Sequence, residues 1–147
     1  MMGLLLGCGL AHLVAARLAA SPWWVPDLTL VGLVLAVWRA PERWILYAVT
    51  AGLLMLVWAV RFPAQVFFAY VGCGSLARLA VGQLASPDGR FQVLVTTLLA
   101  TALMGALLWL ETLWSVSLIG LALGRVALTG LSVVVVKHLT TSRTMRS

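Results

Sequence analysis

The chain has 147 residues, of which 63% are hydrophobic and only 10% are charged. Soluble domains carry roughly 25% charged residues, and one core could not enclose so much apolar surface in a domain of this length. The composition therefore excludes an ordinary soluble domain and predicts an all-α, polytopic integral membrane protein. The net charge of +6 is spread along the chain, which disfavours a nucleic-acid interface.

Six hydrophobic stretches, separated by short breaks rich in proline, glycine and charge, predict about six transmembrane helices with short loops. A single transmembrane domain over residues 1–136 is expected, followed by a basic cytoplasmic tail over 137–147. The predicted spans cover residues 3–20, 22–38, 44–60, 64–85, 91–110 and 114–136.

In the first stretch, small residues recur every four positions, at Gly3, Gly7, Ala11 and Ala15. On a helix this spacing forms a stripe that lets another helix backbone approach closely. We interpret it as a packing surface, either within the fold or against a partner. The last stretch holds a shorter motif of the same kind, at Gly120 and Gly124.

The second stretch holds a short apolar run, Leu28–Val37, which is too short to cross a bilayer alone. Counting from Pro22 to Arg39 gives a thin but sufficient span. Trp23, Trp24 and Trp44 are expected to be anchors at the headgroup level.

The four acids are expected at the membrane faces, two at each, with none near the centre of a span: Asp27, Glu42, Asp88 and Glu111. Asp27 and Glu111, both on the outer face, are expected to be helix-end or interface groups. This distribution argues against an intramembrane proton relay and against a Mg²⁺-binding acidic cluster. Cys8 and His12 have a spacing that a metal could use, but two ligands do not make a site. The sequence therefore predicts no catalytic residue, no metal and no cofactor.

Two arginines fall within predicted spans. Arg78 lies about two turns from the end of its span and can extend its side chain to that end. Arg125 lies near mid-span, so it should face the bundle interior or a polar cavity and bond to carbonyls, to water or to hydroxyls such as that of Thr129.

The remaining basic residues predict the orientation. Two of them, Arg17 and Arg61, fall on the side opposite the C-terminal tail. The side of the tail holds Arg39, Arg43, Arg90, Lys137, Arg143 and Arg146. By the positive-inside rule, both termini should lie in the cytoplasm.

The second stretch and the turn after it carry a resemblance to a known family. Pro26-Asp27-Leu28 opens an apolar run, and Arg39-Ala40-Pro41-Glu42-Arg43 closes it. This arrangement resembles the bacterial rod shape-determining protein MreD family, in which a short early span opens with proline and an acid or amide and closes with a basic, proline-containing turn. The family-motif residues here are Pro26, Asp27, Pro41 and Arg43.

The resemblance covers roughly residues 22–46, and the rest of the chain matches in size and hydropathy. It implies a non-catalytic scaffold in the inner-membrane machinery of cell elongation and peptidoglycan synthesis. The implied direct partner is MreC, with MreB, RodA and a class B penicillin-binding protein in the same complex.

The resemblance also implies a fold like that of the substrate-binding components of energy-coupling-factor vitamin transporters. A substrate-binding component of a small-molecule transporter is therefore the alternative function. The polar and aromatic residues at the outer end fit either function, since interfacial tryptophans are expected in both.

Overall fold

The computed structural model describes residues 1–19, 25–57, 62–83, 89–110 and 116–144, with the side chains of Val116 and of residues 142–144 left out. These segments form six α-helices and contain no strand, which confirms the all-α prediction. The helices are α1 (Met2–Leu18), α2 (Leu28–Arg39), α3 (Trp44–Leu56), α4 (Pro63–Gln83), α5 (Gly89–Leu110) and α6 (Val116–Thr144), with a short 3-10 turn η2 (Pro41–Arg43) before α3.

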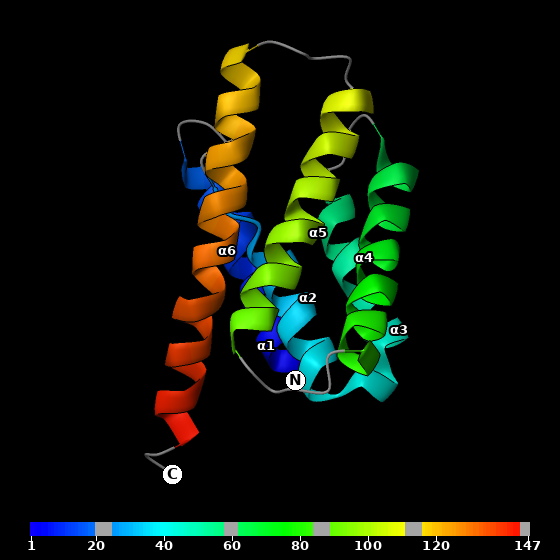
Figure 1. The fold of residues 1–147 in the computed structure, drawn as a ribbon, viewed down its shortest axis with the longest axis vertical. Helices are drawn as coiled ribbons and strands as arrows, with labels where there is room; N and C mark the ends of the chain where they lie inside the picture. The colour runs from blue at the N-terminus through cyan, green and yellow to red at the C-terminus, as the bar shows by residue number, and fades with distance from the viewer. Residues whose placement is uncertain (20–24, 58–61, 84–88, 111–115, 145–147) are drawn as a thin grey trace.

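Helix α2 lies at the centre of the bundle and contacts each of the other five α-helices. In Figure 1 it lies behind α5, between α6 on one side and α3 and α4 on the other. All nine residues from Thr29 to Val37 are buried. A helix that is apolar on every side belongs in a core, so the short run after Asp27 forms the centre of the fold.

The start of α2 differs from the sequence prediction, in which residues 22–38 form one span. Val25, Pro26 and Asp27 are not helical, and α2 begins at Leu28. Proline disfavours the helical conformation in the residue before it, and Asp27 ends the non-helical segment as the N-cap of α2. Two of the predicted anchors, Trp23 and Trp24, lie outside the described residues.

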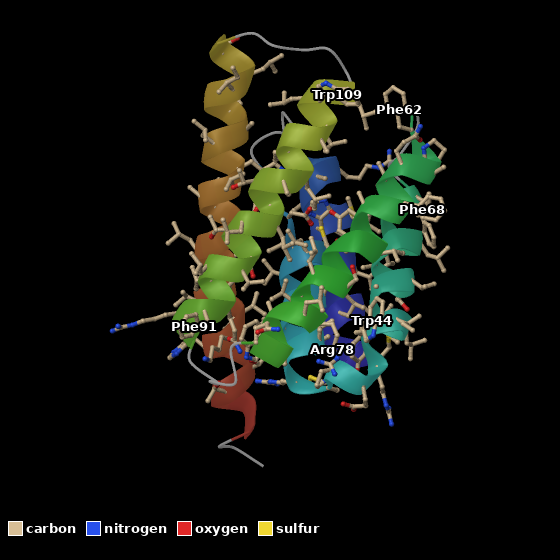
Figure 2. The ribbon with its side chains drawn as sticks, turned by 45° about the vertical axis from the view of Figure 1, so that its right-hand side comes forward. Trp44, Phe62, Phe68, Arg78, Phe91 and Trp109 are labelled. Atoms are coloured by element: carbon tan, nitrogen blue, oxygen red, sulfur yellow. The ribbon has the colours of Figure 1, made fainter. Side chains whose placement is uncertain are left out.

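The lengths and compositions of three helices suit a membrane crossing: α4, α5 and most of α6. Helices α1 and α2 are apolar but shorter. Large apolar side chains cover the outside of the bundle, including Phe68 and Trp109, which are 68% and 69% exposed and project outward in Figure 2. An apolar exterior around an apolar core fits a protein embedded in lipid.

Two further features concern the ends of the bundle. The N- and C-termini lie at the same end, together with the start of α5 (Figure 1). Helix α6 continues from residue 136 to Thr144, so the first residues of the predicted tail form its last turns.

Candidate functional site: a buried polar cluster at the start of α2

Asp27 lies at the centre of a buried polar cluster, and it is only 8% exposed. One carboxylate oxygen, Oδ1, accepts a hydrogen bond from the backbone N–H of Leu30 at 2.9 Å, which is the N-cap bond of α2. The other, Oδ2, accepts from the hydroxyl of Tyr70 on α4. Both oxygens of this buried carboxylate are therefore bonded within the chain, as burial of such a group requires.

The backbone of the same residue is joined to α6. The N–H of Asp27 donates to Oγ1 of Thr129 at 2.9 Å. The Thr129 hydroxyl in turn donates to the carbonyl of Arg125 at 2.8 Å, and the threonine is fully buried. This hydroxyl thus acts both as donor and as acceptor.

Helix α1 is joined to the cluster through His12. The ring nitrogen Nδ1 of His12 lies 3.0 Å from the carbonyl oxygen of Pro26. Because a carbonyl can only accept, Nδ1 carries the proton in this contact. His12 is 3% exposed, so this polar ring is buried with its bond to the segment that precedes α2.

Arg125 belongs to the same cluster through its backbone carbonyl, which accepts from Thr129. It interacts electrostatically with Tyr70, and its Nε is buried with no hydrogen-bond partner among the described residues. The hydroxyl of Thr129 bonds to the backbone carbonyl of Arg125 and to Asp27. The side chain of Arg125 is partly exposed.

The cluster shows that Asp27 is buried by protein. Asp27 is a helix-end group, as expected, but its end of α2 is enclosed by α1, α4 and α6. Since α2 has only 12 residues, its start is recessed within the bundle instead of lying at the surface. The bonds of Asp27 hold the central helix against three neighbours, which is a structural role.

The other two family-motif residues, Pro41 and Arg43, lie just beyond the opposite end of α2. Pro41 is at the start of the 3-10 turn η2, where its missing N–H costs nothing. Arg43 ends this turn and is exposed, and α3 begins at the next residue. The motif therefore delimits the central helix, with Pro26 and Asp27 at its start and Pro41 and Arg43 just beyond its end.

Arg78 lies apart from the Asp27 cluster. A Cβ built on Gly82, one turn further along α4, would lie 3.5 Å from Nη1 of Arg78. The guanidinium is therefore directed toward the C-terminal end of α4, and Figure 2 shows Arg78 and Trp44 close to that end of the bundle. This is the direction in which a long basic side chain extends to reach the headgroups.

The small-residue stripe of α1 faces outward. Gly3, Gly7 and Ala11 are exposed, and Ala15 is half-buried. No described atom lies within 4 Å of a Cβ built on Gly3 or Gly7, and the same holds for Gly120 and Gly124 on α6. Neither motif makes a close contact within the described chain, so packing against a partner stays a prediction.

The close helix contacts use other glycines, which the sequence analysis missed. A Cβ on Gly32 would lie 2.8 Å from Cβ of Cys8, and one on Gly74 would lie 2.5 Å from Cβ of Ala48. Gly32 is the one glycine inside the apolar run of α2, and this could have indicated its contact with Cys8. Glycine is unfavourable in a helix interior, so its presence there suggests that a neighbouring group needs the space.

Comparison with protein-family models, with curated proteins and with solved structures gave no match.

Proposed function

We propose that this protein is a non-catalytic membrane subunit that binds a partner membrane protein in the bacterial cell-elongation complex. The proposal extends the resemblance to MreD, whose motif residues Pro26, Asp27, Pro41 and Arg43 delimit the central helix here. An MreC-like protein is the direct partner in this proposal, with MreB, RodA and a class B penicillin-binding protein in the same complex.

The observation that carries the partner-binding role is the outward-facing stripe of α1. The opposite face of α1 is packed in the bundle through Leu5, Cys8, Gly9 and His12. The stripe itself leaves a smooth, exposed strip of backbone at Gly3, Gly7 and Ala11. Within a membrane, small residues let helix backbones approach and gain van der Waals contact, so a partner helix fits this face.

The proposed location is the inner membrane, with both termini in the cytoplasm. The two termini lie at one end of the bundle (Figure 1). Arg39, Arg43, Arg90 and Lys137 belong to helix ends and turns that the positive-inside rule assigns to the cytoplasm.

Affinity purification of the tagged protein in mild detergent, followed by mass spectrometry, tests the proposal. The wild type should recover an MreC-like protein and other elongation proteins. Gly7→Leu combined with Ala11→Leu should reduce that recovery, because overpacking a close contact costs about 1–3 kcal/mol. Its thermal stability should stay close to wild type, since both positions are exposed.

The matched control is Ala102→Leu combined with Ala106→Leu on α5, where both positions are also exposed. This control should recover the partner as the wild type does. Equal recovery with the α1 variant would mean that the stripe faces lipid. Recovery of an ATPase module and no elongation protein would contradict the proposed function.

One observation favours the alternative, a substrate-binding component of a small-molecule transporter. The Nε of Arg125 is buried beside Tyr70 with no described hydrogen-bond partner, and a bound ligand could supply an acceptor. Under this alternative, the same purification recovers a transporter module, and mass spectrometry of the native protein shows a small molecule whose occupancy falls in Arg125→Leu.

A further inference from the structure

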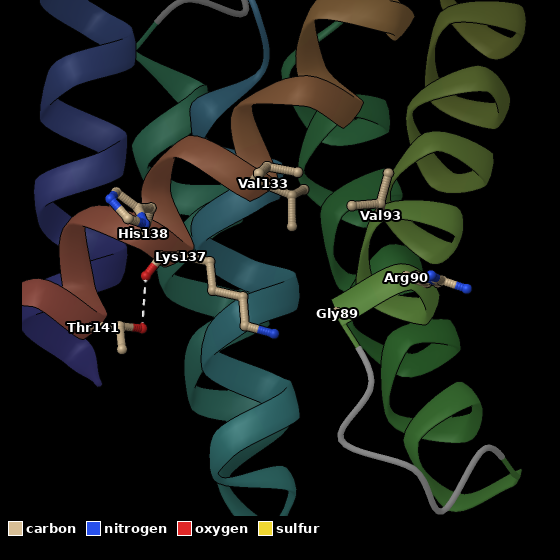
Figure 3. A pocket seen from close by; sticks show the side chains of 8 residues that line it. Gly89, Arg90, Val93, Val133, Lys137, His138 and Thr141 are labelled. Atoms are coloured by element: carbon tan, nitrogen blue, oxygen red, sulfur yellow. Dashed lines mark hydrogen bonds between the residues drawn. The ribbon is translucent and has the colours of Figure 1, made fainter.

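A second site lies far along α6 from the Asp27 cluster, where the first turn of α5 faces the C-terminal turns of α6. A pocket of about 380 Å³ opens between the two helices (Figure 3). Its apolar lining comes from Val93, Val133 and Val134. Its polar lining comes from Gly89, Arg90, Lys137, His138 and Thr141.

Positive charge is concentrated at this pocket. A Cβ built on Gly89 would lie only 2.7 Å from Nζ of Lys137, so the ammonium occupies the space beside the first residue of α5. The N-terminus of a helix carries partial positive charge, and Lys137 therefore faces a group of like sign. In Figure 3, His138 on α6 and Arg90 on α5 lie on opposite sides of Lys137, and the Arg90 side chain points away from Lys137.

Within the ranges that the structure describes, no carboxylate is paired with Lys137 or Arg90. The two described acids are Asp27, which is bonded to Tyr70, and Glu42, which is in the turn before α3. Clustered positive charge attracts an anion, and the attraction is largest where the surroundings are apolar.

The apolar half of the pocket indicates the kind of anion. Val93 and Val133 lie one turn further into the bundle than Arg90 and Lys137. Val133 is buried against Val31 and Leu35, whereas Val93 and Val134 keep exposed apolar surface. Both helices are long and apolar enough to cross a membrane, so the pocket joins a basic rim to a lipid-facing groove. An amphiphile with an anionic head and a hydrocarbon chain matches both halves.

We propose that this pocket binds an anionic phospholipid. Lys137 contacts the phosphodiester, and the exposed Arg90 side chain adds attraction from the neighbouring helix end. Val93 and Val134 pack against the first methylene groups of an acyl chain. Basic pockets between transmembrane helices recognise such headgroups by the same combination of charge and depth. The inference does not depend on the identity of the protein partner.

Binding of dioleoyl phosphatidylglycerol and dioleoyl phosphatidylcholine to the purified full-length protein, measured by native mass spectrometry, tests the proposal. The wild type should prefer phosphatidylglycerol. Lys137→Gln and Arg90→Gln should each weaken that binding about fivefold. Gly89→Ala should also weaken it, because the new Cβ displaces the ammonium while the net charge is unchanged.

The matched control is Arg39→Gln, an exposed position outside the pocket that makes the same change in net charge. It should bind phosphatidylglycerol as the wild type does. Equal binding of the two lipids, or equal loss in Arg39→Gln, would overturn the proposal. Competition by inorganic phosphate at the concentration of the lipid would overturn it as well, in favour of a soluble anion.

Asp88 precedes Gly89 and lies outside the described residues, so its substitution supplies an independent arm of the same experiment. In the sequence, Asp88 adds a negative charge next to Gly89, and such a charge repels an anionic headgroup. Asp88→Asn should therefore bind phosphatidylglycerol as tightly as the wild type or more tightly. Weaker binding in this variant would contradict the assignment of Lys137 to the headgroup.

Discussion

Asp27 owes its position to its neighbours in sequence. Pro26 prevents the helix from starting earlier, and the Asp27 side chain caps a helix of only 12 residues. At 1.5 Å per residue such a helix is about 18 Å long, well short of a hydrocarbon core of about 30 Å. An acid that caps so short a central helix lies within the bundle, and there it needs partners from other helices.

These partners could not be predicted from the sequence. Tyr70 and Thr129 are 43 and 102 residues away from Asp27, and each is a single polar residue within an apolar stretch. A lone hydroxyl has no periodic pattern, so its direction depends on how the helices pack. The cap itself was readable, since Pro-Asp before an apolar run is a typical helix start.

Tyr70→Phe should lower the free energy of unfolding by about 1–3 kcal/mol, because Oδ2 of Asp27 stays buried and loses its donor. Thermal unfolding in detergent measures this change. Tyr47→Phe is the matched control: Tyr47 is equally buried at 3% exposure, and its hydroxyl makes no hydrogen bond with any described residue. Equal stability of the two variants would mean that the bond to Asp27 contributes nothing.

At the scale of the helices, packing is controlled by single glycines that permit close approach. Four-residue stripes are conspicuous in the sequence, yet Gly3 and Gly7 face outward while Gly32 and Gly74 make the close contacts. A small residue permits close approach but does not determine which face is turned to a neighbour. That choice depends on the larger apolar residues of all six helices together.

Gly74→Ala should destabilise the contact between α3 and α4 by about 1–3 kcal/mol, because the new methyl group would lie 2.5 Å from Cβ of Ala48. Gly72→Ala, two residues earlier on the same helix, meets no described atom within 4 Å. This control should be neutral or more stable by up to about 1 kcal/mol, since alanine favours helix over glycine. A smaller loss in Gly74→Ala than in Gly72→Ala, measured by thermal unfolding, would contradict this account.

At the scale of the whole molecule, the order of six helices followed directly from hydropathy and breaks. The ends of the helices were less predictable. Helix α2 begins at Leu28, later than the predicted span, and forms the buried centre of the bundle. Helix α6 continues to Thr144 because nothing in its polar end breaks a helix. Hydropathy measures the preference of a segment for an apolar environment. Lipid and a protein core are both apolar environments, so hydropathy could not show that α2 is covered by other helices and not by lipid.

In the proposed orientation, both termini lie in the cytoplasm. Cysteine labelling in intact cells tests this orientation most directly. Cys8→Ala and Cys73→Ala first remove the two native thiols, which are buried. Thr112→Cys and Ser142→Cys then place one thiol in the connection between α5 and α6 and one near the C-terminus. A membrane-permeant maleimide should label both variants and serves as the control for reactivity.

With an impermeant maleimide, the account predicts labelling of the Thr112→Cys variant in intact cells and labelling of the Ser142→Cys variant only after the cells are opened. Labelling of the Ser142→Cys variant from outside, with protection of the Thr112→Cys variant, would contradict the proposed orientation of the bundle.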